Sequence, residues 1–182
     1  IAAELSCEVG SVTAQLESAR QRLLGVRNER VWPARDDKVL TSWNALAIRG
    51  LAIASRALEK PEFTEAAERA LAFTRKQLWR PDPDGGGRLL ATAKEGVAHL
   101  NAYLDDYAYL AIALLEMLQL RWRNEDAAWL RQVLDAMLEH FEDAGRGGFF
   151  FTSDDHEALI HRSKSFSDDA IPAGNGIAAR AL

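Results

Sequence analysis

Helical segments of two kinds alternate along the chain, and this alternation limits the folds that the chain can adopt. Three segments place apolar side chains on one helical face and polar side chains on the other: residues 12–26, 62–78 and 126–141. Two segments are apolar around almost the whole helix: residues 41–58 and 104–120. A helix with one polar face lies at a surface, whereas an apolar helix is covered on every side. We therefore expect an all-α fold with an inner and an outer ring of helices.

An internal repeat supports this arrangement. Apolar helices begin near residues 41, 104 and 173, which gives steps of 63 and 69 residues. The glycine loops at Gly86 and Gly148 also lie 62 residues apart, each followed by an extended apolar run such as residues 88–92. Hairpins of this length fit part of an (α/α)6 toroid with short β segments in its loops. We expect residues 1–182 to form a single partial domain of a larger protein.

Composition and charge exclude several classes of protein. The chain is 48% hydrophobic and 27% charged, as in ordinary soluble proteins. Its net charge of −5 argues against nucleic acid as a partner. No run reaches the roughly 20 apolar residues that span a membrane, and residues 1–6 show no signal-peptide pattern. Cys7 is the only cysteine, so we expect no internal disulfide, a reducing compartment and a cytoplasmic protein.

Acidic residues recur in the loops that precede the apolar helices. These loops comprise residues 35–44, 103–107 and 167–175. Carboxylates gathered around one rim suit acid/base work on a polar substrate such as a carbohydrate. We therefore predict three catalytic residues: Asp106, Asp37 and Asp168. The same loops supply the predicted substrate-binding residues: Trp43, Asn44, Asp105, Tyr107, Lys38 and Asn175.

Each of these side chains also has a structural interpretation. Aspartate near a helix N-terminus is favoured by capping and by the helix dipole. Trp43 and Tyr107 either stack against a sugar or belong to the core. The two asparagines must hydrogen-bond either backbone groups or substrate, because both stand at the starts of buried helices. Lys38 pairs with Asp36 or Asp37 in a purely structural reading.

Motifs for metals and cofactors are incomplete. Asp105 and Asp106 lack the further acid of an aspartate-rich magnesium box, because Tyr109 stands at that position. The four histidines lack the spacing of a metal-binding helix: His99, His140, His156 and His161. There is no phosphate-binding loop and no dinucleotide glycine pattern. We expect neither a metal nor a cofactor.

Five stretches carry a family resemblance in order along nearly the whole chain. They comprise residues 36–44, 103–108 and 147–152, the pair Arg162 and Lys164, and residues 168–175. This pattern resembles the thioredoxin-domain-containing family that includes spermatogenesis-associated protein 20 and bacterial homologues. The resemblance implies an N-terminal thioredoxin-like domain followed by an (α/α)6 domain similar to N-acylglucosamine 2-epimerases and six-hairpin glycosidases. This chain corresponds to the middle of that second domain.

Three functions are compatible with these observations. The first is a carbohydrate-active module: an epimerase, an isomerase or a glycoside hydrolase. The second is a non-catalytic binding module that acts with the attached thioredoxin-like domain, and the third is a structural scaffold. We also expect self-association or low stability, because a half ring exposes the lateral faces of its terminal hairpins.

Overall fold

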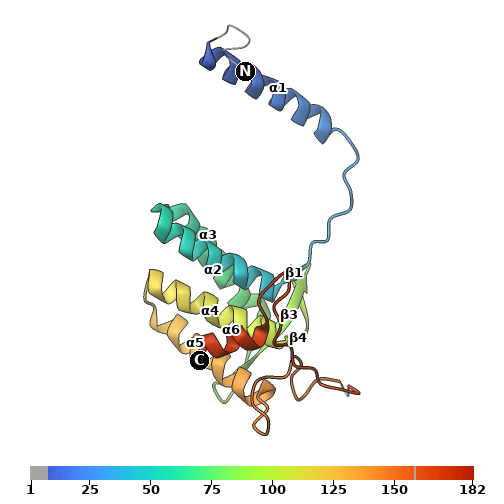
Figure 1. The fold of residues 1–182 in the computed structure, drawn as a ribbon, viewed down its shortest axis with the longest axis vertical. Helices are drawn as coiled ribbons and strands as arrows, with labels where there is room; N and C mark the ends of the chain where they lie inside the picture. Colours follow the sequence, from blue (N-terminus) through green and yellow to red (C-terminus); the bar gives the residue numbers. More distant parts are fainter. Residues whose placement is uncertain (1–7, 158) are drawn as a thin grey trace. The chain divides into compact units, whose positions relative to one another are not determined.

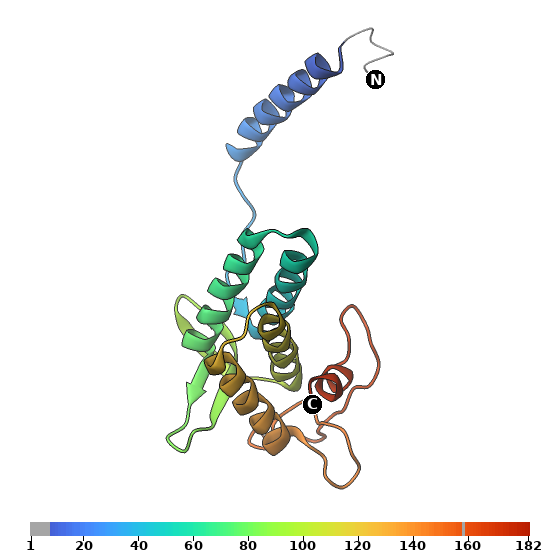
Figure 2. The same ribbon diagram turned by 90° about the vertical axis from the view of Figure 1, so that its left-hand side faces the viewer.

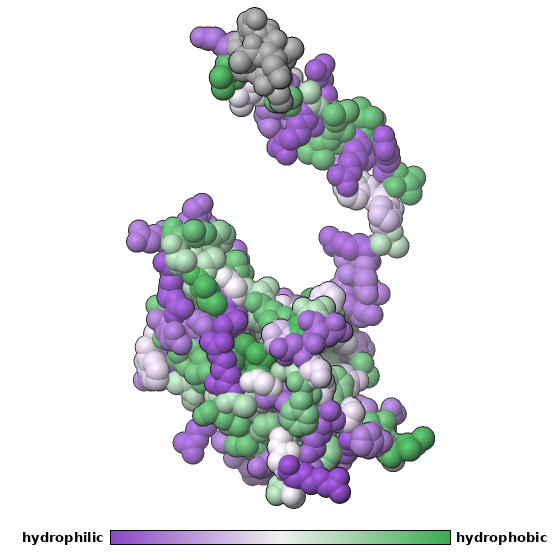
Figure 3. Space-filling view, viewed as in Figure 1, coloured by the Kyte–Doolittle hydropathy of each residue, from purple (hydrophilic) through white to green (hydrophobic). Residues whose placement is uncertain are grey.

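The computed structural model describes residues 8–157 and 159–182, so the expectations for Cys7 and residues 1–6 lie outside the described part. The chain divides into two compact units, residues 1–36 and 37–182. The described part of the first unit contains helix α1, Val9–Asn28, which matches the amphipathic segment predicted for residues 12–26. None of its residues is buried, and Leu16 and Leu23 are exposed. Figure 3 shows apolar residues at the surface of this helix. The prediction of one domain over the whole chain stays a prediction.

The second unit consists of two helical hairpins and one further helix, joined by a small sheet (Figure 1). The first hairpin pairs α2, Thr41–Leu58, with α3, Pro61–Phe73, and the second pairs α4, Leu104–Leu120, with α5, Asn124–Phe141. Helix α6, Gly174–Ala181, packs on α4. Because α4 contacts α2 on one side and α6 on the other, these three helices form an inner layer, and α3 and α5 form the outer layer (Figure 2). The predicted all-α fold with two layers of helices is confirmed.

Local sequence signals explain where the first hairpin turns. Helix α2 ends at Leu58, because the next residue, Glu59, has a left-handed backbone conformation (φ 54°). Pro61 then starts α3, since its fixed φ suits a first helical position and its missing N–H costs nothing there. The predicted helix over residues 62–78 continues past α3 as one π-helical turn, η1, Thr74–Leu78.

Helix α4 lies at the centre of the core, as its apolar sequence predicts. Its side chains from Tyr107 to Leu114 are all buried. Glu116 is one of two buried acids of this helix, and it forms ion pairs with Arg56 (2.7 Å) and Arg49 (3.7 Å) of α2. A buried carboxylate is tolerated only when it is paired in this way.

Helix α2 is buried on one face only, which corrects the expectation that it is covered on every side. Its buried stripe consists of small and branched residues at helical spacing: Thr41, Ala45, Ile48, Ala52 and Ser55. Trp43 is 65% exposed and Leu58 59% exposed. The sequence pattern specifies how apolar a helix is, but burial also requires neighbours, and in the described chain α3 and α4 pack on one side of α2.

A four-stranded antiparallel sheet lies at the end where α2 and α4 begin (Figure 1). It comprises β1, Val39–Leu40, β2, Trp79–Pro81, β3, Gly87–Lys94, and β4, Val97–Asn101. Strand β3 pairs with all three others, with Leu40 opposite Thr92 and Thr92 opposite His99. The extended segment predicted for residues 88–92 is confirmed within β3, whereas the other strands were not predicted. The apolar run after Gly148 forms only an isolated bridge between Phe149 and Glu142.

Candidate functional site

The first turns of α2 and α4 are joined by the carboxylate of Asp106. One of its oxygens, Oδ1, accepts a hydrogen bond from the backbone N–H of Ser42 at 2.8 Å. The other, Oδ2, accepts the backbone N–H of Tyr103 at 2.9 Å and thereby caps its own helix. A single buried side chain therefore fixes the leading ends of two inner helices to each other.

Asp105 makes the corresponding link to α6. Its carboxylate accepts a hydrogen bond from the backbone N–H of Gly174, the first residue of that helix. The two elements approach so closely that a Cβ atom on Gly174 would lie 2.1 Å from Oδ1 of Asp105. Successive residues on a helix point about 100° apart. The neighbouring residues Asp105 and Asp106 on α4 can therefore contact two different helices, α6 and α2.

The loop before α6 brings a third acid to this region. Asp168 accepts a hydrogen bond from the backbone N–H of Ala173 at 2.8 Å. The hydroxyl of Tyr109, on α4, donates to the carbonyl of Pro172 in the same loop. Burial, together with the negative charges of Asp105 and Asp168, raises the pKa of Tyr109 to about 12. A carboxylate of α4 and a carboxylate of the loop before α6 thus raise the pKa of one phenol.

Burial raises the pKa values of the neighbouring residues Asp105 and Asp106. Burial raises the pKa of Asp106 to about 6, although the hydrogen bonds from Tyr103 and Ser42 act in the opposite direction. Burial also raises the pKa of Asp105, against the hydrogen bond from Gly174. An acid that titrates near neutral pH can both donate and accept a proton under working conditions. Asp106 is only 4% exposed, whereas Asp105 is half-buried and lies nearer to solvent.

The loop before α2 contributes exposed residues. Asp37 and Lys38 are both exposed, and each makes an interaction within the chain. Trp43 lies exposed on the first turn of α2, next to the residue whose N–H binds Asp106. The side-chain Nδ2 of Asn44 donates a hydrogen bond to the backbone carbonyl of Leu40 at 2.8 Å.

Two of the predicted substrate-binding residues serve the core instead. Tyr107 is fully buried against Phe141, and its hydroxyl accepts the backbone N–H of Leu89 at 2.8 Å, so it presents no surface to a ligand. Asn175 is buried as well. Its Oδ1 accepts the N–H of Phe149 at 2.7 Å, and its Nδ2 donates to the carbonyls of Phe149 and Ser165. Because both side chains are buried and hydrogen-bonded to backbone groups of the chain, we expect a ligand-binding role for neither.

The hydroxyl of Tyr107 leads to a first prediction. Tyr107→Phe is expected to lower the free energy of unfolding by about 1–2 kcal/mol, because the buried N–H of Leu89 loses its acceptor. Urea denaturation of the variant and of the wild-type chain measures the difference. Tyr103 is half-buried and its hydroxyl makes no hydrogen bond to Leu89, so Tyr103→Phe serves as the matched control. Equal stability of Tyr107→Phe and the wild-type chain would contradict the assigned role.

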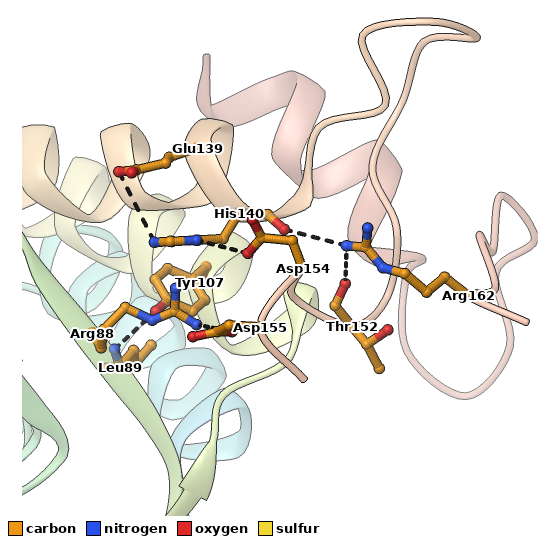
Figure 4. A network of polar contacts seen from close by, with 9 residues as sticks. All are labelled: Arg88, Leu89, Tyr107, Glu139, His140, Thr152, Asp154, Asp155 and Arg162. Atoms are coloured by element: carbon orange, nitrogen blue, oxygen red, sulfur yellow. Dashed lines mark hydrogen bonds and ion pairs between the residues drawn. The ribbon is translucent and has the colours of Figure 1, made fainter. Parts of the chain in front are cut away.

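A second polar network, which sequence reasoning missed, joins β3, the end of α5 and the loop after it (Figure 4). Arg88 forms an ion pair with Asp155 at 2.8 Å, and His140 bonds Asp154 at 2.9 Å. Burial alone would raise the pKa of Asp155, but the Ser153 hydroxyl and the Arg88 guanidinium outweigh it and hold the pKa below its ordinary value. No local motif marks this network, because its members come from segments more than a dozen residues apart.

The described residues contain no cluster suited to a metal ion. No group of three or more histidine, cysteine, aspartate or glutamate side chains is placed to hold one in residues 8–157 and 159–182. In the same part of the chain, no helix has the length and apolar character needed to cross a membrane.

Comparison with known proteins finds relatives by sequence. No protein-family model matches the chain. The chain is 28% identical over 193 residues to human spermatogenesis-associated protein 20, a match that covers all of this chain and 24% of that protein. It is 28% identical over 185 residues to an uncharacterized protein of Caenorhabditis elegans, covering 96% of this chain and 24% of that protein. The chain thus spans about a quarter of the length of these relatives.

Solved structures with a similar fold are carbohydrate enzymes. A D-mannose isomerase matches with a TM-score of 0.61 at 14% identity, over 79% of this chain and 37% of that one. Cellobiose 2-epimerase from Spirochaeta thermophila matches with 0.58 at 15% identity, over 72% and 33%. An inactive variant of the α-1,6-mannanase from Salegentibacter sp. HEL1_6, with two adjacent aspartates changed to asparagine and α-1,6-mannotriose bound, matches with 0.54 at 18% identity, over 75% and 38%. These likenesses establish the six-hairpin (α/α)6 type of fold.

Proposed function

We propose that the acidic end of α2, α4 and α6 binds a carbohydrate and belongs to a carbohydrate-active module, an epimerase, an isomerase or a glycoside hydrolase. The observation that carries this proposal is the adjacent pair Asp105 and Asp106 between the leading ends of three inner helices. In the mannanase of similar fold, an inactive variant has two adjacent aspartates exchanged for asparagine. An adjacent aspartate pair in the same type of fold supports a similar role here.

We assign a role to each side chain according to its exposure. Asp105 is half-buried and contacts the sugar. Asp106, whose pKa lies at about 6, exchanges a proton with a hydroxyl group or the ring oxygen of the sugar. Asp168 and Asp37 supply further carboxylates from the flanking loops. Trp43 offers its exposed indole as a stacking surface for a sugar ring. In this assignment Asn44, Lys38, Asn175 and Tyr107 support the loops.

Trp43 provides the most direct test. Trp43→Ala is expected to weaken sugar binding about tenfold, because a stacked indole contributes about 1–2 kcal/mol. Calorimetric titration with D-mannose, cellobiose and α-1,6-mannotriose, the sugars that the structural neighbours act on or hold, measures this effect on the full-length protein. The stability of the chain should stay unchanged, since the side chain is 65% exposed.

A matched control exists at the other end of the same layer. Trp122 is 70% exposed and follows the C-terminal end of α4, away from the acidic end. Trp122→Ala should therefore leave sugar binding unaltered. Equal losses in both variants would show that the effect is not specific to the acidic end and would contradict the proposal.

A second candidate function follows from the hydrogen bonds of the acids. Asp105, Asp106 and Asp168 all accept backbone N–H groups, which is what a purely structural role requires. In that case the chain is a non-catalytic binding or scaffold module that acts with an attached thioredoxin-like domain. The absence of binding of all three sugars to the full-length protein at millimolar concentration would favour this second function.

A further inference from the structure

A basic pocket of about 670 Å³ lies on the loops that follow α5, outside the acidic end of the inner helices. We call it the Phe150 pocket. Its lining includes Phe150, Arg146, Arg162, Lys164 and Asp143. The whole chain carries a net charge of −5, whereas the lining of this pocket contains three cations and one acid.

The acid in this pocket is already neutralised. Asp143 forms an ion pair with Lys164, and it accepts the backbone N–H groups of Gly145 and Arg146, both at 3.1 Å. The hydrogen bond from Lys164 holds the pKa of Asp143 below its ordinary value, and the turn N–H groups act in the same direction. Lys164 also donates to the carbonyl of Gly147 at 2.8 Å. Lysine and aspartate therefore cancel each other's charge inside the turn.

The two arginines keep their charge. Arg162 donates Nη2 to the carbonyls of Thr152 at 2.6 Å and His140 at 3.3 Å, which orients the guanidinium but does not neutralise it (Figure 4). Its Nε is buried and has no hydrogen-bond partner among the described residues. Arg146 is exposed on the turn. In residues 8–157 and 159–182 neither arginine forms an ion pair.

An aromatic ring completes the recognition surface. The guanidinium of Arg162 lies over Phe150 with 4.2 Å from its central carbon to the ring centroid, and the Lys164 ammonium lies 4.7 Å from the same centroid. Cation–π contacts of this kind hold both cations at fixed positions. An arginine that is held by backbone carbonyls and an aromatic ring is preorganised, so little side-chain entropy is lost when it binds an anion.

We propose that the Phe150 pocket binds the oxyanion of a small molecule, either a phosphate or a carboxylate group. Two uncompensated guanidinium groups supply positive charge, and Arg146 also offers forked N–H donors that match the oxygens of a phosphate or a carboxylate. Phe150 offers an apolar contact to the carbon skeleton that bears the anion. This site is separate from the acidic residues of the proposed carbohydrate site, and its test does not depend on that function.

The test uses calorimetric titration of the 182-residue chain in buffer of about 20 mM ionic strength, where surface charges are weakly screened. The probes are inorganic phosphate, glucose 6-phosphate and glucuronate, with glucose as the neutral control. We expect the charged probes to bind and glucose not to bind at the Phe150 pocket. Binding of both phosphates but not of glucuronate identifies phosphate as the ligand group, and the opposite pattern identifies carboxylate.

Variants connect the binding to the pocket. Arg146→Ala and Arg162→Lys should each raise the dissociation constant of the bound anion at least about fivefold. Arg131→Ala removes an arginine that is 85% exposed on α5, outside the pocket lining, and should change nothing. Arg146 makes no side-chain contact that the fold needs, so its variant remains informative if Arg162→Lys fails to fold. Absence of binding by every anion, or equal affinity in the wild-type chain and Arg146→Ala, would overturn the proposal.

Discussion

Between about pH 4 and pH 7 the wild-type chain is expected to lose about 2 kcal/mol of unfolding free energy relative to its Asp106→Asn variant. The cause is the burial of the Asp106 carboxylate, which raises its pKa from 3.8 to about 6 in the folded chain. The unfolded chain exposes the same group to water. Folding therefore favours the protonated acid.

The sign follows from proton binding. In the window between the two pKa values the folded chain holds more protons at Asp106 than the unfolded chain does. The stabilisation is fully present below the unfolded pKa and is lost as the pH rises through about 6. Asparagine does not titrate, so the variant lacks this contribution to the pH dependence.

Urea denaturation at several pH values measures the difference between the two curves. Asp135→Asn removes a carboxylate that is 68% exposed on α5 and controls for the change in net charge. Its stability should follow the wild-type curve at every pH. Parallel curves for the wild-type chain and Asp106→Asn would show that Asp106 does not titrate in this range, and the proposed proton exchange with a sugar would lose its basis.

The helices were predictable because their signals are local. Residues 41–58 and 104–120 form helices with the predicted bounds, since apolar spacing, proline and capping residues act within a few positions along the chain. The burial of α2 was not predictable in this way. Its apolar residues permit burial on every side, but the contacts that decide it come from α3 and α4. The exposure of Trp43 could be learned only from the folded chain.

The roles of the candidate site residues depend on partners far away in the sequence. The loop pattern correctly identified a region in which the leading ends of inner helices meet. It left open whether the acids bind substrate or backbone, because Asp106 reaches Ser42, 64 residues away. Tyr107 had two interpretations for the same reason, and the contact with Leu89 of β3 places it in the core. Strands β1 and β4 are too short to produce a clear alternating pattern.

The junction between α4 and α6 should be sensitive to a small substitution. Gly174→Ala is expected to lower the free energy of unfolding by about 2–4 kcal/mol. Its new methyl group would overlap Oδ1 of Asp105 and lie 3.3 Å from a methyl group of Leu104. Asp105 must then rotate away, so the buried N–H of Gly174 loses its acceptor.

The same helix provides the control. Gly176 lies two residues further along α6, and a Cβ there would have no neighbour within 4 Å. Gly176→Ala is therefore expected to leave stability unchanged or to raise it by about 0.5–1 kcal/mol, because alanine favours the helix. A comparison of the two variants by thermal or urea unfolding separates the steric conflict at the junction from the general effect of alanine. Similar effects of both substitutions would contradict the close approach.

A double substitution connects the loss to Asp105 itself. In Asp105→Ala the carboxylate is absent, so the methyl group of Gly174→Ala no longer meets Oδ1 and costs less than it does in the wild-type chain. We expect the double variant to be more stable than the sum of the single losses predicts, by about 1–2 kcal/mol. If the losses of unfolding free energy in the two single variants were strictly additive, the steric conflict of Gly174→Ala would not involve Asp105. Non-additivity would show that Asp105 holds α6 against α4, which is the condition for the three inner helices to present one acidic surface.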